Sequence, residues 1–193
     1  MLTQLSTVKA RLAIDPLDVT NDAVITNAIK AISQVFEKEC NRAFARQAGA
    51  AQEFDADDTE ILLDTFPLET ITRFEKKSSE AEGWIEQTNV DYLVRHACMI
   101  SLESPLGSSR ELGRVVYTGG YVLPGDTVGT GQTALPDDLE QAAVEQAAAW
   151  FQNRDKLGLV RYWPKGGIYL QFLPGDLLPT VRSTLDHYKR IAF

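Results

Sequence analysis

Apolar residues near the start of the chain follow a helical period. They recur at three- and four-residue steps from Thr3 to Ala13 and again from about Thr20 to Cys40, which predicts two amphipathic helices. Asp15-Pro16 ends the first helix, because the residue before a proline avoids helical geometry. Asn41 suits the left-handed residue that stops the second helix.

The strongest helix signal lies between Pro136 and Gly158. Pro136 suits a first helical position and Gly158 a left-handed stop, while Arg154 and Lys156 suit the negative end of the helix dipole. One face of this helix is rich in alanine: Ala142, Ala143, Ala147 and Ala149. Such a face is typical of a helix that packs closely on other helices.

Between these helical segments the period of the pattern changes to two. From about Gln52 to Tyr121, short alternating runs are separated by Asp, Gly, Ser and Pro, which predicts a small antiparallel sheet. The helices before and after the sheet have apolar faces that would be buried by packing against each other. We therefore predict an α+β fold: one domain over 1–193, with a mainly helical core of about four helices from 1–50 and 134–193 and a β-rich insertion at about 51–122.

Two further segments complete the predicted organisation. The stretch 124–134 is rich in Gly and Thr and predicts a flexible surface loop. After the long helix, 159–173 predicts an aromatic-rich hairpin that turns at Lys165-Gly166-Gly167, and Asp176 to about Ile191 predicts a last helix.

Composition excludes several classes of function. Lys and Arg number 19 against 27 Asp and Glu, so the net charge of −8 disfavours nonspecific binding to nucleic acid or to an anionic membrane. Cys40 and Cys98 form no metal-binding spacing, which favours two reduced thiols in a reducing cytoplasm. No stretch approaches the roughly 20 apolar residues of a membrane helix. We expect no membrane association.

Two clusters invite a chemical interpretation. The acidic run 53–60 includes Asp55, Asp57 and Asp58, but it has no glycine for the sharp turn of a calcium loop, so a solvated strand edge or loop is the better interpretation. His96 and Cys98 would share one face of a strand, yet such a pair lacks an orienting third group. We expect no enzyme activity, no cofactor and no bound metal.

The order of parts resembles a known family of viral proteins. A start like MLTQLSTVKARLAI, a helix ending FEKECNRAF, the strand VVYTGGYVLPGD, the helix LPDDLEQAAVEQAAAWFQNRDKLG and an ending HYKRIAF are similar to head-tail connector proteins, also called adaptor or head-completion proteins, of long-tailed bacteriophages. The resemblance spans nearly the whole chain and is strongest over Tyr117 to Gly158.

This resemblance implies a structural role in the virion. Such proteins form a ring of about a dozen identical subunits beneath the portal, with head-to-tail contacts between subunits. The ring grips the portal on one side, receives a stopper or the tail on the other, and lets double-stranded DNA pass through its lumen without sequence-specific binding. The free subunit could be a monomer before it docks.

Three groups of residues are candidates for these contacts. Trp150, Phe151 and Arg154, near the end of the long helix, are candidates for the subunit interface. The basic and aromatic C-terminus is the candidate for portal docking through Tyr188, Lys189, Arg190 and Phe193. Acidic residues that would repel phosphates are candidates for the lumen or for loop contacts: Asp55, Asp57, Asp58 and Asp126.

Two alternatives to the connector stay open at this point. One is a small metal-dependent hydrolase that uses the acidic run 53–60, through Asp55, Asp57 and Asp58, together with His96. The other is a monomeric protein-binding adaptor, which differs from the connector only in lacking ring closure.

Overall fold

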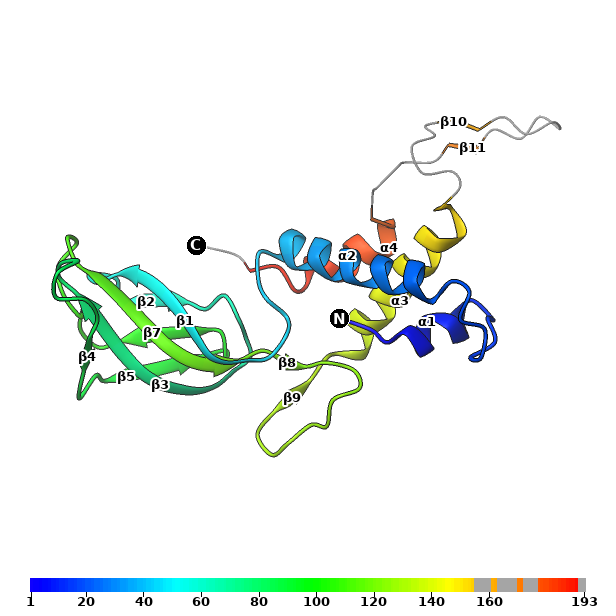
Figure 1. Ribbon diagram of the computed structural model, residues 1–193. Helices are drawn as coiled ribbons and strands as arrows, with labels where there is room; N and C mark the ends of the chain where they lie inside the picture. Colours follow the sequence, from blue (N-terminus) through cyan, green and yellow to red (C-terminus); the bar gives the residue numbers. More distant parts are fainter. Residues whose placement is uncertain (155–160, 163–169, 172–176, 191–193) are drawn as a thin grey trace. The chain divides into compact units, whose positions relative to one another are not determined.

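The computed structural model describes residues 1–154, 161–162, 170–171 and 177–190 (Figure 1). The chain divides into two compact units. A helical unit consists of Met1–Cys40 and Pro136–Lys189, and a sheet unit consists of Asn41–Leu135 and Arg190–Phe193. With four helices and antiparallel sheets among the described residues, at 30% helix and 29% strand, the fold is α+β, as the sequence predicts.

The helical unit is built around one long helix. Its elements are α1 (Leu5–Arg11), α2 (Asp22–Cys40), α3 (Asp137–Gln152) and α4 (Pro179–Asp186). Helix α3 packs against the other three, and its small residues are buried in that contact: Ala142, Ala143, Ala147 and Ala148. The sequence prediction places Ala149 on this face, but Ala149 is only partly buried and Ala148 is buried instead. The apolar stripe of α2 is buried too: Ile25, Ile29, Ile32, Phe36 and Cys40. Within the described residues, no helix is long and apolar enough to cross a bilayer.

The ends of two helices differ from the prediction. Helix α3 begins at Asp137, because the backbone of Pro136 is extended (φ −59°, ψ 137°). It ends at Gln152, and Asn153 just beyond donates both its backbone N–H (3.1 Å) and its side-chain amide (2.9 Å) to the carbonyl of Ala149. The predicted stop at Gly158 lies outside the described residues.

The last helix is shorter than its sequence pattern suggests. Helix α4 begins at Pro179, and the buried side chain of Gln146 accepts the Leu178 N–H (2.9 Å) just before it. It ends at Asp186, because the side chains that follow bond to other parts of the chain, as described below. The pairing predicted before this helix is present: β10 (Arg161–Tyr162) is antiparallel to β11 (Leu170–Gln171). Their predicted turn at 165–167 lies outside the described residues.

The sheet unit contains two antiparallel sheets that share one core. The larger sheet has the order β1 (Gln47–Asp55), β7 (Leu112–Gly119), β3 (Leu68–Lys77), β4 (Ile85–Gln87). The smaller has the order β2 (Glu60–Leu62), β6 (Met99–Leu102), β5 (Tyr92–Arg95). Their common core contains Ile61, Leu63, Phe74, Ile100, Leu102, Val115 and Tyr117. Because side chains alternate along each strand, this burial fixes the register of both sheets.

The segment from Tyr92 to Leu102 is a hairpin and not the single strand that its pattern suggests. The chain reverses at His96 and Ala97, which both have positive φ (51° and 53°), as in a tight hairpin turn. The turn is tied down because the carbonyls of Ala97 and Cys98 accept backbone hydrogen bonds of 2.7 and 2.8 Å from elsewhere in the unit. His96 and Cys98 therefore do not share a strand face, and Cys98 is only partly buried.

One buried lysine shapes the connection between α1 and α2. Lys9 is 3% exposed, and its ammonium donates to the carbonyls of Pro16 (2.9 Å) and Asp18 (2.7 Å) and pairs with Asp22 (3.0 Å). A buried charge is tolerated only when it is paired and hydrogen-bonded in this way.

We therefore predict that Lys9→Ala lowers the free energy of unfolding by about 2–4 kcal/mol, because two carbonyls lose their donor and the Asp22 carboxylate loses its ion-pair partner. Urea unfolding followed by circular dichroism measures the change. Lys30→Ala, at an exposed position on α2, is the matched control and should change stability by less than about 0.5 kcal/mol. Equal effects of the two substitutions would contradict this role for Lys9.

Candidate functional site

The most distinctive surface feature of the sheet unit is the β8–β9 loop, residues 123–132. It connects β8 (Tyr121–Val122) with β9 (Thr133–Ala134), and these two short strands pair in parallel at its base. The sequence prediction of a loop over 124–134 is therefore too long by its last two residues. Thr133 and Ala134 pair with β8, and the Leu135 N–H donates to the carbonyl of Val122 (3.0 Å) just beyond them.

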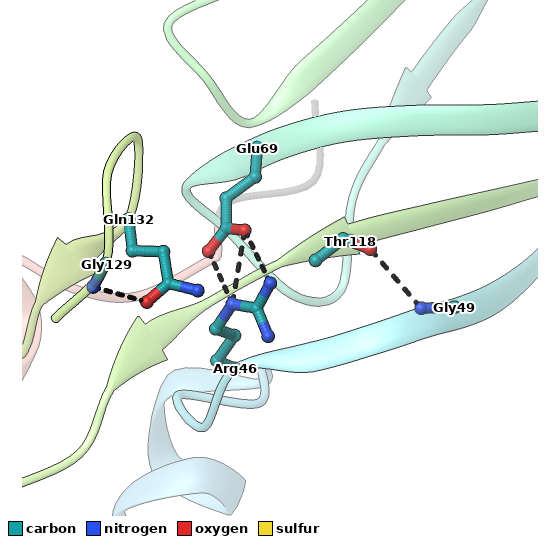
Figure 2. Close-up of polar contacts among 6 residues, drawn as sticks. All are labelled: Arg46, Gly49, Glu69, Thr118, Gly129 and Gln132. Atoms are coloured by element: carbon teal, nitrogen blue, oxygen red, sulfur yellow. Dashed lines mark hydrogen bonds and ion pairs between the residues drawn. The ribbon is translucent and has the colours of Figure 1, made fainter. Parts of the chain in front are cut away.

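Hydrogen bonds within the β8–β9 loop define its path. The side-chain oxygen of Gln132 accepts the Gly129 N–H (2.8 Å), and the Gln132 N–H donates back to the carbonyl of Gly129 (3.2 Å) (Figure 2). Gly125 and Gly131 have φ values of 99° and 79°, a region that favours glycine. From the sequence, these glycines indicate a flexible loop. In the structure they allow specific turns.

Beside this loop is a shallow hollow of about 290 Å³. Its lining is mainly polar and combines the chain that enters the sheet unit with the loop: Ala45, Arg46, Tyr121, Val122, Leu123, Asp126, Thr127 and Gln132. Such a surface has donors and acceptors for a polar peptide segment, and the described residues that line it include no Ser, Cys or His.

Arg46 is held at the hollow by a bidentate ion pair. Its Nε lies 2.9 Å from Oε1 of Glu69, and its Nη2 lies 2.9 Å from Oε2 (Figure 2). The hydrogen bonds to Glu69 raise the pKa of the Arg46 guanidinium above its ordinary value. A fork of this geometry orients the guanidinium and leaves Arg46 less able to attract a free phosphate. Sequence reasoning missed this pair, because its members are far apart along the chain.

The predicted acidic residues fall into two separate groups. Asp55, Asp57 and Asp58 are exposed at the end of β1, where the Asp58 N–H donates to the carbonyl of Asp55 (2.9 Å). Asp126 is exposed in the β8–β9 loop and lines the hollow. Asp55 pairs with Leu112 at the first residue of β7, whereas the loop follows the last residue of β7, so the two groups lie at opposite ends of that strand.

The geometry does not assemble the metal site of the hydrolase alternative. Among the residues that the structure describes, no three His, Cys, Asp or Glu side chains are grouped so that they could hold a metal ion. His96, which that alternative requires, sits in the turn between β5 and β6.

The candidate subunit-interface residues at the end of α3 differ in exposure. Phe151 is 9% exposed and belongs mainly to the core of the helical unit, whereas Trp150 is half-buried and Arg154 is exposed. The Arg154 guanidinium lies over the Phe151 ring at 4.3 Å and donates to the Phe151 carbonyl (3.0 Å). Trp150 and Arg154 are therefore the members of this group that a neighbouring protein could reach.

The C-terminal docking candidates bond within the chain. The Tyr188 hydroxyl donates to Asp138 (2.6 Å), and Lys189 pairs with Asp186 (2.9 Å) and Glu39 (3.1 Å). Hydrogen bonds to both carboxylates raise the pKa of the Lys189 ammonium above its ordinary value, and Asp186 has the larger effect.

Arg190 is bound in the same way, since it donates to the carbonyl of Leu62 (2.7 Å) and pairs with Asp64 (3.0 Å). Phe193 lies outside the described residues. A partner that uses this segment would therefore exchange existing pairs for new ones.

Comparison with solved structures finds the same fold in chains of gene transfer agent particles. The chain matches a chain in the neck of an empty gene transfer agent particle computed with C6 symmetry, with a TM-score of 0.64 and 14% identity over 98% of this chain and 90% of the other. It matches a chain in the neck of a native particle computed with C12 symmetry, with a TM-score of 0.56 and 14% identity over 98% and 92%. A chain in the virion of a native particle matches with a TM-score of 0.57 and 16% identity over 97% and 89%.

The chain has the fold of a neck protein. This confirms the resemblance to head-tail connector proteins at the level of the fold, and the match extends over both units. Neither a scan against protein-family models nor a search of curated proteins finds a match.

The structure of the β8–β9 loop predicts a local effect of Gln132→Ala. Loss of the side-chain acceptor should make the Gly129 amide exchange its hydrogen roughly fivefold faster, the equivalent of one lost hydrogen bond of about 1 kcal/mol. Native-state hydrogen exchange measured by NMR tests this. Thr130→Ala, an exposed neighbour in the same loop, should leave the rate unchanged. An unchanged Gly129 rate in Gln132→Ala would show that the bond does not order the loop.

Proposed function

We propose that this chain is a structural head-tail connector subunit of a tailed, phage-like particle. About twelve copies form a ring beneath the portal, and the ring joins the capsid to a stopper or the tail. The observation that carries the proposal is the fold shared with neck chains over 98% of this chain. The C6 and C12 symmetries of those necks support a cyclic assembly. In this role the protein is not an enzyme, and it acts by its shape and charge.

In the proposed ring, the end of α3 contacts the neighbouring subunit. Trp150 and Arg154 supply an aromatic surface and a guanidinium, which are enriched where protein interfaces gain most of their binding energy. The C-terminal residues Tyr188, Lys189, Arg190 and Phe193 dock on the portal. Lys189 and Arg190 are already paired with carboxylates. Carboxylates on an acidic portal surface would replace these partners, so each basic side chain would keep an ion pair after docking.

Of the two acidic candidates, we assign the β8–β9 loop to the lumen. Asp126 is its one charged residue, and the loop offers no basic side chain to a phosphate. DNA that passes a wall without positive charge does not exchange its counterions for protein contacts, so it slides freely. The turn with Asp57 and Asp58 lies at the other end of β7, and it is a control for the position of the channel.

Ring formation is the first test of the proposal. Mixed with the portal protein of the same particle, the chain should form rings of about twelve subunits in electron micrographs. Arg154→Glu should prevent closure of the ring while lowering the melting temperature by only a few degrees, because Arg154 is exposed and its contacts are confined to Phe151 in the same helix turn among the described residues. Lys30→Glu, on the exposed side of α2, should assemble normally. If the wild-type chain binds portal but never closes a ring, a monomeric adaptor is the correct description. If it does not bind portal, the proposal is wrong.

The rate of DNA release tests the proposed role of the β8–β9 loop in the lumen. In particles that carry Asp126→Lys, DNA ejection should slow at least severalfold, because about twelve new cations would face the phosphates. Stopped-flow fluorescence of a DNA-binding dye measures the rate. Raising the salt concentration should relieve the defect, since screening weakens the contact. Asp57→Lys should eject at the normal rate. The reverse result, slow ejection only with Asp57→Lys, would move the channel to the other end of β7.

A further inference from the structure

The β5 strand exposes an unusual row of apolar side chains. Tyr92, Leu93 and Val94 are 42%, 67% and 46% exposed, although they are consecutive residues of one strand. In a strand with one covered face, alternate residues would be buried. The face shared by Tyr92 and Val94 is only partly covered, by a contact between the Tyr92 and Phe74 rings (centroids 5.5 Å apart), and Leu93 leaves the other face open.

β5 is also an edge strand. Among the strands that the structure describes, β6 is its one neighbour, in the order β2-β6-β5. Natural proteins usually protect such edges with charge, proline or a covering segment, because an open edge pairs readily with another strand. Three of the four residues of β5 are apolar, and its one charge is Arg95 at the end of the strand, which lies 3.9 Å from Glu60.

The register shows which backbone groups of β5 face outward. The Leu102 N–H donates to Thr59 on the β2 side (2.7 Å), and Leu102 is the partner of Tyr92 across the β5–β6 pair. Backbone groups alternate in direction along an antiparallel strand, so the N–H and C=O groups of Tyr92 point away from β6. The same alternation turns those of Val94 outward.

Next to this edge is a hollow of about 460 Å³ with acidic character. It is lined by Asp91, Tyr92, Leu93, Ser101, Leu102 and Glu103. Two carboxylates and several apolar groups line it, and no basic side chain does. A strand added to β5 would carry alternate side chains toward this hollow, where a lysine or arginine would meet Asp91 and Glu103.

We propose that the open edge of β5 binds an extended segment of a different protein, one that combines apolar and basic side chains and adds a strand beside β5. Main-chain hydrogen bonds to Tyr92 and Val94 provide the affinity, and the apolar and acidic side chains select the sequence. A second copy of this chain fits less well through the other edges of these two sheets, because β1, β2 and β4 carry Glu53, Asp55, Glu60 and Glu86 and no lysine or arginine. Pairing through the β5 strand of a second copy, which ends in Arg95, is the alternative that the concentration test below separates.

Model peptides test this binding on the full chain. The probes are a fluorescein-labelled peptide of sequence KVTVKV and its acidic counterpart EVTVEV, measured by fluorescence anisotropy. The basic peptide should bind at least tenfold more tightly, and the preference should shrink as the salt concentration rises. No binding up to millimolar protein, or equal binding of both peptides, would overturn the proposal.

Two substitutions separate side-chain from backbone recognition. Leu93→Lys should weaken binding of KVTVKV at least tenfold by removing apolar area and repelling the peptide. Val94→Pro should weaken it similarly, because it removes an outward N–H while leaving the bonds to β6 in place. Leu17→Lys, at a residue 88% exposed in the helical unit, should bind like the wild type. Unchanged affinity of Val94→Pro would rule out strand addition.

Amide exchange identifies the occupant independently of these variants. The amides of Tyr92 and Val94 should exchange more slowly once KVTVKV is bound, whereas that of Leu93 should change little. If the same two amides slow on raising the concentration of the chain alone, a second copy occupies the edge and the proposed partner is wrong.

Discussion

Burial of the alanine-rich face of α3 against α2 is the contact on which the helical unit depends. It joins two stretches of chain that are separated in sequence by the whole sheet unit. Alanine makes this possible, since small side chains let helices approach closely and still bury the stripe from Ile25 to Cys40. Gln146 extends the arrangement to α4 by accepting the N–H of Leu178. A larger residue on this face of α3 would disturb its contacts with all three other helices.

Backbone hydrogen bonds likewise join distant segments near the start of the sheet unit. The Arg46 N–H donates to the carbonyl of Tyr121 (2.9 Å), and the Tyr121 N–H donates to that of Phe44 (2.8 Å). These bonds place Arg46 beside the β8–β9 loop and make the hollow there a product of two distant segments. The bidentate pair with Glu69 then fixes the direction of the guanidinium. Backbone pairing therefore sets the position of Arg46 on this polar surface, and the ion pair sets the direction of its guanidinium.

The surfaces proposed for function share a physical character. The end of α3, the β8–β9 loop and the edge of β5 are parts of well-packed elements that leave polar groups or apolar side chains open to a partner. None of them needs a cofactor to act as proposed. In the proposed role the chain would act by presenting surfaces that are already ordered, because such surfaces lose less entropy on binding. Its acidic composition disfavours nonspecific attraction to DNA.

Local sequence signals determined the main elements. The stripe of α2, the left-handed stop at Asn41 (φ 50°) and the alanine face of α3 follow from spacing and backbone preference, and each could be predicted without the structure. Periodicity also indicated the sheet and with it the α+β class. Only the tertiary structure decided where Tyr92–Leu102 reverses, because the turn at His96 and Ala97 lacks the usual glycine or asparagine and is held by backbone bonds from distant residues.

Contacts between residues far apart in sequence also determine the candidate functional surfaces. They pair Arg46 with Glu69 and Arg190 with Asp64, and they leave β5 as an open edge. Pairings of this kind leave no periodic trace in the chain, so the sequence determined which elements form and the tertiary structure decided which side chains remain available.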